Sequence, residues 1–120
     1  MKIILAISLI LFTSNAFALT ETAVEGGELF SRVCTICHNN GEVPANAPDM
    51  HDIKSRYLKV APSKEVFVEK VIFWLSQPAT SKSEFPEAID HFGLMPKFRL
   101  TTSKMFKVAT YIYENDFKKP

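Results

Sequence analysis

The sequence predicts an all-α protein, and three observations lead to that fold class. Four apolar residues near the C-terminus stand at i, i+3, i+4 and i+7, on one face of a helix: Met105, Val108, Ala109 and Ile112. Prolines and glycines divide the rest into segments of helical length. No segment shows the apolar–polar alternation of a half-buried strand. We therefore expect four to five helices in one domain.

The first 18 residues have the composition of a secretory signal peptide. Lys2 gives a positive start, Ile3–Phe12 is an apolar run, and Ala16–Ala18 has the small residues that a signal peptidase requires. The apolar run is shorter than the roughly 20 residues of a membrane-spanning helix; a retained N-terminal anchor is the alternative. We expect cleavage after Ala18, a mature domain of residues 19–120 in the periplasm, and no stable membrane insertion.

The first helix of the domain is expected to begin at Thr22 and to continue to about His38. Thr22 and Glu25 have the spacing of a capping box, and Asn39–Gly41 suits the end of a helix. Gly26–Gly27 lies inside it, where each glycine costs about 1 kcal/mol relative to alanine. Such a pair indicates that another helix approaches closely there.

Two more helices are marked by their flanking residues. Asp49 can cap a helix over about Met50–Val60. Pro62–Ser63 opens the next, about Lys64–Ser76, and Pro78 stops it. Because this second segment is apolar on most faces, we expect it to be buried on several sides.

The last two helices lie in the C-terminal third. Pro86 suits the first position of a short helix over Pro86–Phe92, which Gly93 would close. The final helix follows Thr101 and carries the apolar stripe described above.

The charge balance argues against a nucleic-acid partner. The chain has 14 Lys and Arg residues against 13 Asp and Glu, and loss of Lys2 with the signal would leave the polypeptide neutral. A nucleic-acid-binding domain needs a clear basic excess.

The motif Cys34-Thr35-Ile36-Cys37-His38 carries the chemistry. C-x-x-C-H is typical of c-type haem attachment. On a helix, positions i, i+3 and i+4 share a face, so two thiols can reach the two vinyl groups at one haem edge while the imidazole meets the iron. The sequence thus predicts one covalent haem c, attached through Cys34 and Cys37 and ligated by His38.

Three other uses of these residues are open. A disulfide between Cys34 and Cys37 would close a very small loop. Thiol–disulfide exchange would call for a βαβ pattern, which the sequence does not show. A zinc site could combine both cysteines with two of the histidines His38, His51 and His91, although these lack the paired spacing of zinc motifs.

The chain resembles the class I cytochromes c over nearly all of residues 19–120. The features that carry the resemblance are Gly26 and Phe30 before the motif, Ala47–Met50 after it, Phe92–Pro96, and Val108 with Tyr111. One departure is Met50, where the family more often has leucine. The resemblance implies a cytochrome c fold, with the helices wrapped around one covalent haem and the first and last helices crossing at Gly26.

Met95 is the expected second axial ligand of the iron. It stands on a loop before the last helix, Pro96 restricts the backbone beside it, and the resemblance points to the same residue. Methionine opposite histidine raises the reduction potential relative to two nitrogen ligands. The other candidates for this position are Met50, Met105, His51 and His91.

Four residues are expected to complete the haem pocket. The resemblance makes the carbonyl of Pro48 the acceptor for the free N–H of His38. Arg56, Tyr57 and Trp74 are candidates to donate to the haem propionates, because a buried tyrosine or tryptophan needs a hydrogen-bond partner.

These features predict an electron carrier rather than an enzyme. The protein would be a periplasmic monomer that passes single electrons between redox protein partners through its haem. The alternatives are a haem-based sensor or peroxidase-like enzyme with a labile sixth ligand, and a thiol redox protein without haem.

Overall fold

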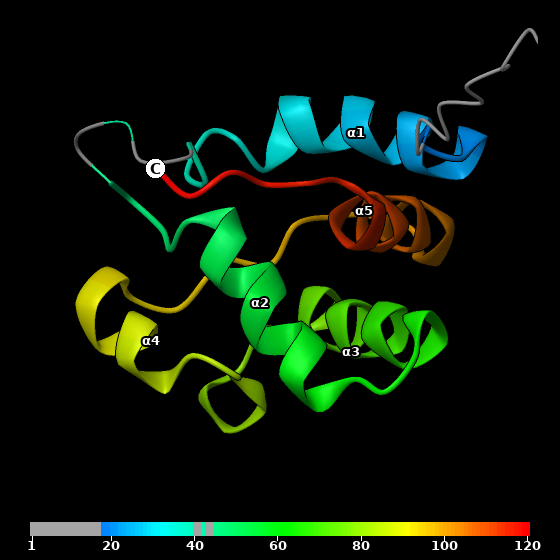
Figure 1. Ribbon diagram of the computed structural model, residues 1–120. Helices are drawn as coiled ribbons and strands as arrows, with labels where there is room; N and C mark the ends of the chain where they lie inside the picture. The colour runs from blue at the N-terminus through cyan, green and yellow to red at the C-terminus, as the bar shows by residue number, and fades with distance from the viewer. Residues whose placement is uncertain (1–17, 40–41, 43–44) are drawn as a thin grey trace, which may run out of the picture.

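The computed structural model describes residues 18–39, 42 and 45–120. The expected signal segment, apart from Ala18, lies outside them. In the described part there is no strand, and the elements are α1 (Glu21–Val33), α2 (Met50–Val60), α3 (Lys64–Ser76), the 3-10 helix η1 (Thr80–Lys82), α4 (Pro86–Phe92) and α5 (Thr102–Glu114), all shown in Figure 1. The predicted all-α class is confirmed for these residues. None of the helices that they form is long and apolar enough to cross a membrane.

The start of α1 differs from the expected one. Thr20, not Thr22, caps the helix, and its hydroxyl oxygen accepts the backbone N–H of Ala23 at 3.2 Å. The same hydroxyl donates to the carboxylate of Glu114 in α5. Thr20 and Thr22 are equally suited to cap a helix by local contacts. The contact with Glu114 in a distant helix favours Thr20.

The end of α1 also differs, because the regular helix stops at Val33 instead of reaching His38. Residues 34–37 form a turn that continues from it. The backbone N–H of His38 still donates to the carbonyl of Cys34 at 2.9 Å, a helix-like i to i+4 bond. The two cysteines and the histidine thus remain close together although they lie beyond the helix.

The predicted boundaries of α2, α3 and α4 are confirmed. Asp49 and Ser63 cap α2 and α3 through side-chain oxygens that accept a backbone N–H of the first turn, at 2.9 Å and 3.2 Å. Pro86 starts α4, and Gly93 ends it with φ of 85°, a conformation that favours glycine.

Helices α1 and α5 cross at Gly26, as the mid-helix glycines predict. A β-carbon at Gly26 would overlap the backbone carbonyl of Lys107 in α5. The rings of Phe30 and Tyr111 pack beside the crossing, with centroids 5.2 Å apart. Figure 1 shows the two helices next to each other on one side of the molecule.

Helix α3 is buried on only part of its circumference. Phe67, Val68, Val71 and Leu75 face the core and are buried. Phe73 is 57% exposed, with the ammonium group of Lys82 4.2 Å from the centre of its ring. The expectation of burial on several sides is therefore wrong, because one face is buried and the side that carries Phe73 is exposed.

The chain after α5 turns back along α1 (Figure 1). The ring of Phe117 packs on that of Phe30, with centroids 5.7 Å apart. Lys54 of α2 donates to the backbone carbonyl of Asn115 at 2.7 Å. The C-terminal segment thereby joins α1 to α2 and supports Phe30 from behind.

Candidate functional site

One cavity lies between the helices and brings the Cys-x-x-Cys-His motif together with Met95. It is partly open to solvent, and residues of all five α-helices line it. The walls between the polar groups are apolar and include Phe30, Ile53, Val71, Leu75, Val108 and Ile112. An apolar cavity with a few polar groups is the usual form of a cofactor site.

Both cysteines of the motif line this cavity as free thiols. Cys34 is buried, and burial raises the pKa of its thiol to about 11. It also lies at the C-terminal end of α1, where the helix dipole disfavours a thiolate. Cysteines that perform thiol–disulfide exchange sit at the opposite, N-terminal end of a helix and have a lowered pKa. The surroundings of Cys34 therefore disfavour that activity.

His38 is held in one tautomer by Pro48. Its Nδ1 lies 2.9 Å from the carbonyl oxygen of Pro48. Because a carbonyl oxygen only accepts, Nδ1 carries the proton and Nε2 has the free lone pair. Burial lowers the pKa of His38, and the bond to Pro48 opposes this only in part. The ring is thus a neutral, oriented imidazole, the form that binds a metal.

Met95 lies in the cavity wall, in the segment between α4 and α5. Its thioether sulfur accepts a hydrogen bond from the indole Nε1–H of Trp74 in α3, at 3.2 Å. The structure therefore brings the expected second ligand into the same cavity as His38.

The other candidate ligands are placed less favourably. Met50 also lines the cavity, but it stands two residues from Pro48 and hence near His38. Met105 is buried in the core of α5 and forms no part of the cavity wall. His51 and His91 lie outside that wall as well.

The three candidate propionate donors separate into two groups. Tyr57 and Trp74 line the cavity. Arg56 does not; its guanidinium donates to the carbonyl of Glu84 at 2.9 Å, pairs with Glu87 at 2.5 Å, and lies 3.8 Å from the centre of the Phe85 ring. Arg56 therefore connects α2 to α4 and to the segment before it instead of facing the cavity.

Ser83, Glu84 and Phe85 form part of the cavity wall, although no pattern in the sequence indicates them. They lie between η1 and α4, in a stretch without helical periodicity. Pro86 signals the start of α4 but gives no information on which way the preceding residues face.

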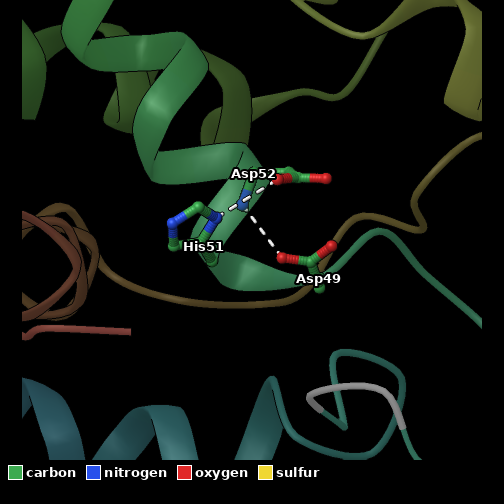
Figure 2. Close-up of side chains that lie close together, drawn as sticks. All are labelled: Asp49, His51 and Asp52. Atoms are coloured by element: carbon green, nitrogen blue, oxygen red, sulfur yellow. Dashed lines mark hydrogen bonds and ion pairs between the residues drawn. The ribbon is translucent and has the colours of Figure 1, made fainter. Parts of the chain in front are cut away.

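A second group of possible metal ligands lies at the start of α2 (Figure 2). Ligand atoms of Asp49, His51 and Asp52 are within 4.8 Å of one another. Asp49 is already used as the cap of the helix, and His51 Nδ1 is 3.2 Å from Asp52 Oδ1. In the part of the chain that the structure describes, no other three His, Cys, Asp or Glu residues come so close. Cys34 and Cys37 form no such group with histidines within the residues that the structure describes.

No protein-family model matches this chain, and comparison with curated proteins and with solved structures also finds no match. The functional assignment therefore rests on the residues of the chain itself.

Proposed function

We propose that this protein is a periplasmic electron carrier similar to the class I cytochromes c, with one covalent haem c and His/Met ligation. One observation carries the proposal: Cys34, Cys37, His38 and Met95, from opposite ends of the domain sequence, line the same apolar cavity. Each has the chemistry that its role requires, two thiols for thioether bonds and two side chains with free lone pairs for the iron.

The residues present fit a haem. Cys34 and Cys37 would hold it by thioether bonds, which consume the two thiols. His38 would offer Nε2, since Nδ1 is engaged by Pro48, and Met95 would offer its sulfur. When bound, the haem supplies an iron that gains or loses one electron. The apolar side chains of the cavity would keep water from this centre, which tunes the reduction potential and limits side reactions.

If His38 and Met95 both held the iron, electron transfer would be favoured over catalysis or sensing. A sensor or a peroxidase-like enzyme needs a position on the iron that is vacant or easily vacated. Trp74 opposes this, because its hydrogen bond holds the Met95 side chain in place. A thiol redox protein without haem is disfavoured by the buried, weakly acidic thiol of Cys34.

The cellular context belongs to the proposal. The signal-like residues 1–18 support export to the periplasm, where the carrier would act as a monomer. Its donor and acceptor would be other redox proteins.

A spectroscopic redox titration tests the function. We expect protein purified from cells that export it and attach haem to be coloured and to show a single one-electron transition. The reduced protein should bind carbon monoxide poorly. A variant with Cys34→Ala and Cys37→Ala should lose the covalent haem. Colourless wild-type protein from such cells would rule the proposal out.

A further inference from the structure

The hydrogen bond between Trp74 and Met95 joins a core helix to a segment without regular secondary structure. Trp74 belongs to α3, which is fixed in the core by Phe67, Val71 and Leu75. Met95 belongs to a segment without regular structure between α4 and α5. The indole Nε1–H donates to the thioether sulfur at 3.2 Å. Helix α3 therefore holds the end of the Met95 side chain.

A methionine sulfur needs such a partner if it is to serve as a fixed ligand. Its side chain is unbranched and has three rotatable bonds, and Met95 is only half-buried. The sulfur has two lone pairs. One accepts from Trp74, and the other stays available for a metal.

We infer that Trp74 is a positioning residue that fixes the sulfur of Met95 for the iron and raises the reduction potential of the haem. The inference rests on the proposed haem function. Donation by the indole N–H draws electron density from the sulfur, which makes it a weaker donor and disfavours the oxidised iron. Hydrogen bonds to ligand atoms are a recognised means by which proteins set such potentials.

This role differs from the one that the sequence suggested for Trp74. The indole has one N–H group, and it donates to the Met95 sulfur, so it is not free for a haem propionate. Tyr57, which also lines the cavity, remains as a donor for a propionate.

The test compares substitutions at Trp74 in the haem-loaded protein. Trp74→Phe keeps an aromatic ring and removes the donor, whereas Trp74→Tyr keeps a ring and restores a donor. Ile72→Ala serves as the matched control, because Ile72 lies on the same helix and packs against the core but does not line the cavity. For each protein, the reduction potential, the thioether-to-iron charge-transfer absorption and the rate of carbon monoxide binding are measured.

We expect Trp74→Phe to lower the equilibrium constant for reduction by about threefold to tenfold, which for a one-electron couple is about 30 to 60 mV. Its charge-transfer absorption should weaken and its carbon monoxide binding should accelerate. Trp74→Tyr should recover much of the potential. Ile72→Ala should lower the melting temperature but leave the potential and the absorption unchanged.

Three results would count against the inference, and they differ in what else they affect. If the wild type shows the charge-transfer absorption and Trp74→Phe leaves it and the potential unchanged, Trp74 does not position the ligand, while the proposed function stands. The same holds if Phe and Tyr lower the potential equally. If the wild-type haem protein lacks the absorption, Met95 is not a ligand, and both the His/Met ligation of the proposed function and the inference are overturned.

Discussion

Glu114 at the end of α5 accepts two hydrogen bonds from Thr20 at the start of α1. The backbone N–H of Thr20 lies 2.8 Å from Oε1, and its hydroxyl lies 2.7 Å from Oε2. Lys64, the first residue of α3, adds an ion pair to Oε2 at 2.8 Å. One carboxylate, 14% exposed, thus connects the ends of three helices that form the walls of the cavity.

This arrangement predicts a loss of stability in acid. Burial opposes ionisation of Glu114, but the hydrogen bonds from Lys64 and Thr20 outweigh it and hold its pKa below the ordinary value. A carboxyl group with a depressed pKa stabilises the fold fully above its unfolded pKa, near 4.5, and this contribution is lost as the pH falls through the lower folded value.

The substitution Glu114→Gln isolates that contribution. It should cost about 1–3 kcal/mol of unfolding free energy at neutral pH and should flatten the decline in stability below about pH 4.5. Denaturant unfolding across the acid range provides the measurement. Glu21→Gln on the exposed first turn of α1 is the control and should have little effect. Parallel pH profiles for the wild type and Glu114→Gln would show that this carboxylate plays no such part.

The helix crossing predicts unequal sensitivities at two neighbouring glycines. Replacing glycine by alanine normally stabilises a helix by about 1 kcal/mol of free energy. At Gly26, however, the added β-carbon would meet the backbone of Lys107. We expect Gly26→Ala to destabilise the protein by about 1–3 kcal/mol. At Gly27 the β-carbon would instead meet the ring of Tyr111 at 3.0 Å. Because a side chain can move, Gly27→Ala should cost much less. Equal melting temperatures for the two variants would mean that the crossing does not have this geometry.

Removal of the second ligand should change the chemistry of the haem. Met95→Ala would open one axial position, lower the reduction potential, and increase both carbon monoxide binding and peroxidase turnover. Met95→His should also lower the potential but keep the position closed, so it separates loss of a ligand from general damage to the fold. If Met95→Ala leaves all three properties unaltered, Met95 is a wall residue only, and the sensor or enzyme alternative is preferred.

Local signals in the sequence were sufficient for most helix boundaries. Asp49, Ser63 and Thr101 each cap a helix through their own side chain within three residues, and Pro86 fixes the backbone at the start of α4. Such contacts depend on neighbours in the chain, which is why a pattern of residue types reveals them.

Contacts between distant residues could not be predicted in the same way. Thr20 is the cap of α1 because of Glu114, which is 94 positions away. Arg56 faces Glu87 and not the cavity, and the partner of Trp74 is Met95, 21 positions away. The spacing Cys34–His38 indicated the chemistry of the site, but only the folded chain shows that Met95 lines the same cavity.

The intact mass of the protein isolated after export from cells that attach haem tests the covalent haem directly. We expect the mass of residues 19–120 plus one haem, and the haem should stay attached through acid–organic extraction. A mass equal to the polypeptide alone, or to the polypeptide less the two hydrogens of a Cys34–Cys37 disulfide, would contradict a covalent haem.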